Sequence, residues 1–114
     1  MKQGRRVMGW TGASLIAAGV AAWLTGGPAL AATSKTVGIK EFKYAPPALT
    51  VPLGTTVTWV NHDEEPHTVT SATGAFASTG LVKDDSFAQT FTKRGTYQYF
   101  CALHPHMKAS VDVR

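Results

Sequence analysis

After Thr33, apolar residues alternate with polar ones in short runs, and this pattern limits the folds that the chain can adopt. A period of two residues is typical of half-buried strands, whereas the 3.6-residue period of an amphipathic helix is almost absent. Turn-forming residues break the runs at Ala45-Pro46-Pro47, Pro52-Leu53-Gly54 and Lys93-Arg94-Gly95. We therefore predict an all-β chain, folded as a Greek-key β-sandwich of about seven or eight strands.

Seven segments have the length and alternation of strands. They lie at about residues 36–43, 48–51, 55–61, 67–71, 86–91, 96–101 and 108–113. Segment 72–85 shows no clear alternation. We predict that it is a loop, with at most one turn of helix, that lies outside the functional site.

Alternation also assigns side chains to the two faces of a strand. In segment 55–61, one face carries Val57, Trp59 and Asn61. In segment 96–101, one face carries Tyr97, Tyr99 and Cys101. We expect Cys101 to point into the core with these aromatic residues, and Phe100 to point outward.

Residues 1–31 have the parts of an export signal. A basic start, with Lys2, Arg5 and Arg6, precedes an apolar stretch, and small residues lie at the cleavage-site positions before Ala32. We predict cleavage after Ala31, which leaves one domain at residues 32–114. The pair Arg5-Arg6 leaves the twin-arginine route open as an alternative to general secretion. A retained membrane anchor is the alternative to cleavage, although the apolar stretch is shorter than the roughly 20 residues of a membrane span.

The charge of the chain belongs mostly to this predicted signal. The whole chain has 11 basic and 7 acidic residues, a net charge of +4, and three of the basic residues precede Ala32. The predicted domain therefore carries a net charge of +1 and has no basic cluster, so nothing indicates nucleic-acid binding. We expect an exported, periplasmic monomer that does not insert stably in a membrane after cleavage.

Cys101 is the only cysteine, so the chain cannot form an internal disulfide. A lone cysteine in an exported chain needs an explanation, and ligation of a metal by the thiolate provides one. The alternative is a buried free thiol that packs as a small apolar residue. A bound metal would also help a domain of this size, whose core alone supplies only a few kcal/mol of stability.

Cys101, His104 and Met107 are closely spaced in a segment that can form one short loop between two strands. A second histidine, His67, lies at the edge of a predicted strand, whereas His62 lies in a polar turn where a solvated role is commoner. One thiolate, two imidazoles and a weak axial thioether are the ligand set of a blue-copper electron-transfer site. Structural zinc sites lack methionine, and iron–sulfur clusters need several thiolates. We predict one type 1 copper ion bound by His67, Cys101, His104 and Met107. The alternative for Met107 is an ordinary core residue.

Two stretches resemble the cupredoxin family, in particular its amicyanin and pseudoazurin branch. They are Val57-Thr58-Trp59-Val60-Asn61 with Pro66-His67, and the stretch from Gly95 to Met107. The resemblance covers the whole predicted domain and implies a trigonal plane of His67, Cys101 and His104 with Met107 as axial ligand. It also implies that the edge of the His104 ring is the electron port.

The resemblance leaves one contact open. Amicyanins commonly have Asn after the first histidine, and this chain has Thr68. The backbone N–H of Thr68 can still donate to the Cys101 sulfur, but the side-chain bond between the two ligand loops is not assured. Pro105 has no N–H and cannot be a second donor to that sulfur. His106 replaces the usual apolar residue, and we expect a surface role for it rather than a second metal site.

These features predict a periplasmic electron carrier that shuttles single electrons through Cu(I) and Cu(II). Four protein ligands leave no position for a substrate, so we expect no enzymatic activity. The resemblance to amicyanin suggests an amine dehydrogenase as electron donor and a c-type cytochrome as acceptor. The alternatives are a periplasmic copper-binding and delivery protein, and a redox subunit tethered by an uncleaved N-terminus.

Overall fold

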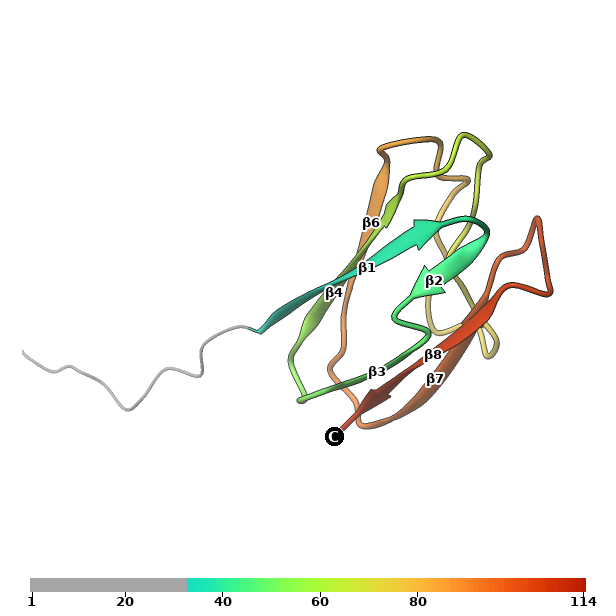
Figure 1. Ribbon diagram of the computed structural model, residues 1–114. Coiled ribbons are helices and arrows are strands. Elements are labelled where there is room, and N and C mark those ends of the chain that lie inside the picture. The colour runs from blue at the N-terminus through green and yellow to red at the C-terminus, as the bar shows by residue number, and fades with distance from the viewer. Residues whose placement is uncertain (1–32) are drawn as a thin grey trace, which may run out of the picture. The chain divides into compact units, whose positions relative to one another are not determined.

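The computed structural model describes residues 33–114, and the predicted signal segment with its cleavage site lies outside this range. Within residues 33–114 the chain forms eight strands and no helix, which confirms the predicted all-β sandwich (Figure 1). The strands are β1 (Ser34–Lys40), β2 (Lys43–Ala45), β3 (Ala48–Val51), β4 (Thr56–Asn61), β5 (Thr70–Ser71), β6 (Ser86–Thr90), β7 (Gly95–Phe100) and β8 (Lys108–Val113). Accordingly, this part of the chain offers no helix that could cross a membrane.

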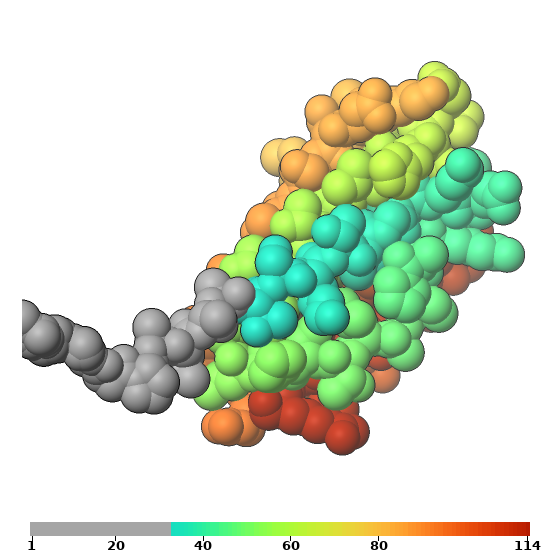
Figure 2. All heavy atoms as spheres, turned by 60° about the vertical axis from the view of Figure 1, so that its left-hand side comes forward, coloured from blue at the N-terminus to red at the C-terminus, as the bar shows by residue number. Residues whose placement is uncertain are grey.

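Two four-stranded sheets make up the sandwich, with the strand orders β2-β1-β4-β6 and β3-β8-β7-β5. β1 pairs with β4 and β3 pairs with β8 in parallel, and the other pairs are antiparallel. Figure 2 shows the first sheet from outside, with β6 in orange, β4 in yellow-green and β1 in cyan side by side. β4 and β7, which precede the two predicted ligand segments, therefore belong to different sheets.

The inward faces follow the predicted alternation. Val57, Trp59 and Asn61 are fully buried, and Cys101 is buried beside Tyr99. The rings of Trp59 and Tyr99 meet edge to face with centroids 5.4 Å apart, across the gap between the two sheets. Burial raises the pKa of Tyr99 to about 12, so its hydroxyl stays neutral at physiological pH.

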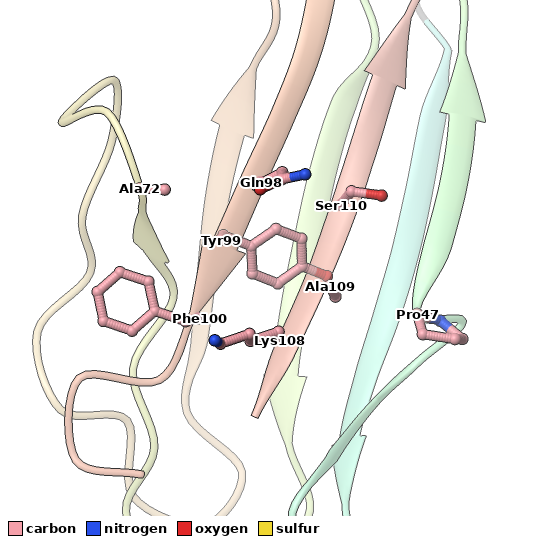
Figure 3. Close-up of a pocket in the computed structure, with 8 residues that line it drawn as sticks. All are labelled: Pro47, Ala72, Gln98, Tyr99, Phe100, Lys108, Ala109 and Ser110. Atoms are coloured by element: carbon pink, nitrogen blue, oxygen red, sulfur yellow. The ribbon is translucent and has the colours of Figure 1, made fainter. Parts of the chain in front are cut away.

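Phe100 lies on the outer face of β7, as predicted, and is half-buried. Its ring lies beside an open groove of about 430 Å³ on the outer face of β7 and β8, with Lys108 and Ser110 across it (Figure 3). Cys101 does not line this groove. Phe100 and Cys101, neighbours at the end of β7, thus point to opposite sides of the sheet.

The end of the first strand differs from the prediction of a strand at residues 36–43. β1 ends at Lys40, and the chain reverses at Glu41 and Phe42 to form β2. Both turn residues have left-handed φ angles, 54° and 59°, which are unfavourable for residues other than glycine. The carboxylate of Asp63 offsets this by accepting the N–H of Glu41 at 2.7 Å and that of Phe42 at 2.9 Å. Local alternation could not indicate an acceptor so distant in the sequence.

The predicted strand at residues 67–71 is also shorter, because only Thr70 and Ser71 form β5. His67 pairs instead with Leu81 through two backbone hydrogen bonds of 3.0 and 2.7 Å. Segment 72–85 contains no helix, which agrees with the predicted loop. The prediction that this loop lies outside the site is wrong. It supplies no ligand side chain, yet its backbone fixes His67.

Asn61 organises the connection that leads from β4 to His67. Its side chain is fully buried and accepts the N–H of Asp63 at 2.9 Å. It also donates to the carbonyl groups of Glu65 at 2.9 Å and Leu81 at 2.8 Å. One amide therefore closes the turn after β4 and joins it to the Leu81 segment.

We predict that Asn61→Ala destabilises the fold strongly. The substitution removes the side-chain partner of the Asp63 N–H and of the Glu65 carbonyl, and one of the two donors to the Leu81 carbonyl. Each unsatisfied buried group costs about 1–3 kcal/mol. Urea unfolding should show that the free energy of unfolding falls by about 3 kcal/mol. In the control Thr58→Ala, on the outer face of β4, it should fall by less than about 1 kcal/mol. Equal losses in the two variants would contradict this role of Asn61.

Candidate metal centre

Two connections meet at Cys101, one that passes between the sheets and one within the second sheet. The β4–β5 connection brings His67, and the loop between β7 and β8 brings His104. The Cys101 Sγ lies 3.8 Å from His67 Nδ1 and 3.6 Å from His104 Nδ1, and the three candidate ligand atoms all lie within 4.8 Å of one another. Atoms at this spacing can surround one ion, because metal bonds to sulfur and imidazole nitrogen are about 2.0–2.3 Å long.

The loop after β7 is closed by its own backbone. The N–H of His104 donates to the Cys101 carbonyl at 3.1 Å, and the N–H of Met107 donates to the His104 carbonyl at 2.9 Å. The N–H of Cys101 donates in turn to the Met107 carbonyl at 3.1 Å. These bonds place Met107, the fourth predicted ligand residue, beside Cys101, and its side chain is buried.

The cluster is buried except on one side. Cys101 and His67 are fully buried, whereas His104 is half-buried. His62 and His106 are exposed, and the ring of His106 lies 6.5 Å from that of His104. Of the four histidines, only His67 and His104 lie at the cysteine, and His104 connects the cluster to the surface.

Thr68 joins the two connections. Its N–H donates to Cys101 Sγ at 3.3 Å, as the sequence suggested. Its hydroxyl accepts the N–H of Ala102 at 2.7 Å and bonds to the hydroxyl of Thr70 at 2.8 Å. The side-chain bond between the loops, which the replacement of Asn by Thr left open, is therefore made by the threonine.

Asp63 determines which nitrogen of His67 faces the cysteine. Its Oδ2 lies 2.9 Å from His67 Nε2. An ionised carboxylate only accepts hydrogen bonds, so Nε2 carries the proton and Nδ1 is free toward Cys101. Partial burial raises the pKa of Asp63, but hydrogen bonds from Phe42, Glu41 and His67 outweigh this and hold the pKa below its ordinary value.

Sequence reasoning did not identify three residues that support the cluster. Asp63 orients His67, Leu81 pairs with its backbone, and the ring of Phe42 contacts both histidine rings. An acidic residue four positions before a candidate histidine was the available signal for Asp63. The other two contacts come from segments that carry no motif.

The donor set fits copper. The buried thiol has no disulfide partner, it accepts an N–H from Thr68, and two imidazole nitrogens converge on it. A soft sulfur donor with two imidazoles suits copper in both of its common oxidation states.

Asp63 gives a test in acid. Because the pKa of Asp63 is lower in the folded chain, its ionised form stabilises the fold above its unfolded pKa of about 4, and this contribution is lost as the pH falls through the folded pKa. In urea unfolding of the metal-free protein, the free energy of unfolding should be larger for the native chain than for Asp63→Asn, and this gap should be constant at neutral pH. The gap should narrow below about pH 4. A constant gap down to pH 3 would show that the carboxylate charge is not responsible.

Comparisons with known proteins address the family of the chain. Residues 14–113 match the family model of the cupredoxin-like domain. Amicyanin of Paracoccus versutus is 40% identical over 87 residues, a match that covers 72% of this chain and 66% of the relative, or slightly less than two thirds of its length.

Two solved structures extend the similarity to the fold. A purple cupredoxin from Nitrosopumilus maritimus is 33% identical, with a TM-score of 0.66, and the match covers 70% of this chain and 99% of that one. An amicyanin variant in its reduced Cu(I) form is 34% identical, with a TM-score of 0.67, and the match covers 77% of this chain and 87% of that one. Since the family model spans most of the sequence and solved relatives share the fold, the chain belongs to the cupredoxin-like family.

Proposed function

We propose that the protein is a type 1 blue-copper electron carrier whose copper ligands are His67, Cys101, His104 and Met107. The observation that carries the proposal is the buried Cys101 Sγ, which lies between the Nδ1 atoms of His67 and His104 at 3.8 and 3.6 Å. A bound copper ion would supply the one-electron chemistry, alternating between Cu(I) and Cu(II).

The surrounding residues support fast electron exchange by keeping the ligands still. Backbone bonds within the loop hold Cys101 and His104, and the Leu81 pairing holds His67. Thr68 fixes the two loops against each other, so neither ligand position depends on the ion alone. Little rearrangement would then accompany a change of charge at the site.

The same arrangement argues for a carrier rather than an enzyme. Four protein ligands would leave no open coordination position, and an open position is what catalytic metal sites keep for water or substrate. His104 is the cluster residue that reaches the surface, so we assign it as the electron port. The relatives named amicyanin and the Cu(I) state of one of them support copper as the ion.

Location and partners follow from the predicted signal and the family. We propose export to the periplasm with cleavage after Ala31, and a monomeric domain at residues 32–114. By similarity to amicyanin, an amine dehydrogenase would donate electrons and a c-type cytochrome would accept them. The intact mass of the exported protein tests the cleavage, and reduction by each candidate partner tests the pairing.

The spectrum of the copper(II)-loaded protein is the first test. We expect an intense thiolate-to-copper absorption band and narrow copper hyperfine splitting, bleached by a mild reductant and restored by reoxidation. Cys101→Ala should abolish the band because the thiolate is its source. His104→Ala should change the spectrum, whereas His106→Ala, an exposed histidine of the same loop, should not.

Other outcomes separate the alternatives. A weak tetragonal copper spectrum without the thiolate band would show that Cys101 is not a ligand, and would favour a copper-delivery protein. Because one similar structure is a purple cupredoxin, the fold does not fix the colour, and the position of the band needs to be measured.

Thr68 provides a test of ligand rigidity. Thr68→Val keeps the shape and the backbone N–H but removes the hydroxyl that accepts from Ala102. We expect faster copper loss to an excess of chelator, by about tenfold, with the thiolate band retained. Thr68→Ser, which keeps the hydroxyl, should behave as the native protein; loss rates that are equal in the valine and serine variants would refute the role of the hydroxyl.

A further inference from the structure

The turn between β1 and β2 supplies no candidate ligand atom, yet its second residue lies against both histidines of the cluster. The ring of Phe42 meets the ring of His67 edge to face, with centroids 4.9 Å apart and an interplanar angle of 83°. It meets the ring of His104 in the same way, at 4.8 Å and 77°. Such edge-to-face pairs are a preferred packing of aromatic rings, so Phe42 restricts both imidazoles at once.

Phe42 also forms a boundary between the cluster and a hollow. A cavity of about 440 Å³ is lined by Phe42, Tyr44, His106 and Met107, together with the flexible side chains of Lys43 and Lys108. Phe42 is 36% exposed, whereas His67, on its other side, is fully buried. The ring therefore separates an open, partly cationic hollow from the imidazole that it contacts.

The backbone that presents Phe42 is held in an unfavourable conformation. Glu41 and Phe42 have φ angles of 54° and 59°, and two-residue hairpin turns of this kind are usually formed by Asn-Gly or similar pairs. A sequence of two residues with bulky side chains costs stability at such a turn. Strain of this kind persists only where surrounding contacts impose it.

One carboxylate imposes it. Asp63 Oδ1 accepts the N–H of Glu41, and Oδ2 accepts both the N–H of Phe42 and the Nε2–H of His67. The side chain of Asp63 is only 12% exposed. Asp63 thus fixes the turn that carries Phe42 and the imidazole against which Phe42 packs.

We propose that the β1–β2 turn caps the metal centre, with Asp63 and Phe42 acting as a coupled pair of positioning residues. Asp63 holds the turn and the tautomer of His67. Phe42 immobilises the rings of His67 and His104 and keeps water in the hollow away from the His67 ring. The inference rests on the proposed function for the identity of the ion. The cap itself concerns only the two histidines and their neighbours.

The test compares solvent exchange at His67 with metal loss. In the zinc(II)-loaded protein, which is diamagnetic and has no redox chemistry, NMR reports the exchange rate of the His67 Nε2 proton. In the copper(II)-loaded protein, decay of the thiolate band in excess chelator reports metal loss. We expect Phe42→Ala and Asp63→Ala each to accelerate both processes by about 10- to 100-fold, the usual effect of losing an outer contact of a metal-ligating histidine.

Matched variants exclude a general loss of stability. Leu53→Ala removes an apolar side chain of similar exposure, 39%, at the connection between β3 and β4, and it should change neither rate. Phe42→Tyr keeps the ring and should retain both native rates. If Phe42→Ala does not fold, Phe42→Leu, which keeps apolar volume without a ring, should still accelerate the exchange.

A double-mutant cycle tests the coupling of the pair. If Asp63 acts partly by holding the turn, the double variant Phe42→Ala with Asp63→Ala should accelerate proton exchange and metal loss by less than the product of the two single effects. Native exchange rates in both Phe42→Ala and Phe42→Leu would overturn the cap. If the copper(II) spectrum of the unsubstituted protein lacks the thiolate band, the proposed function is overturned instead. The zinc measurements would still decide on the cap.

Discussion

The hydrogen bonds of Thr68 connect the two halves of the candidate site. Its N–H reaches the buried Cys101 sulfur, and its hydroxyl accepts the N–H of Ala102, the residue after that cysteine. The β5–β7 pairing sets Thr70 opposite Phe100 and so brings the segment after His67 beside the end of β7, but the ladder stops short of His67 and Cys101 themselves. The spacing of the cluster therefore depends on contacts between loops, and these contacts require the sandwich to be closed.

The core reaches this junction through its aromatic residues. Tyr44 donates from its hydroxyl to the Thr68 carbonyl at 2.5 Å and packs edge to face on Tyr99, at 4.8 Å, which in turn contacts Trp59. Burial, with a smaller effect of the neighbouring Cys101, raises the pKa of Tyr44 far above its usual value, so this donor is retained at any physiological pH. The largest buried ring and the thiol-bearing loop are thus parts of one packed unit.

The sequence predicted what local pattern and chemistry determine. Alternation assigned Trp59 and Cys101 to inward faces, and the Cys101-to-Met107 spacing identified a loop whose residues converge. The reversal at Glu41 and Phe42 was missed because the acceptor that imposes it, Asp63, lies in another connection. The pairing of Leu81 with His67 was missed for the same reason: backbone partners in irregular segments leave no periodic signal.

The strand order also determines when the site can form. β8, the last strand, lies between β3 and β7, and β1, the first, is paired in parallel with β4. Such pairings join residues far apart in the sequence, and folds rich in them form slowly. The loop with Cys101 and His104 immediately precedes β8, so during synthesis the sulfur and the second imidazole emerge when nearly all the other strands already exist. Assembly of the cluster consequently follows synthesis of the loop that ends at Met107, and an ion held by all four candidate ligands can be acquired only after that point.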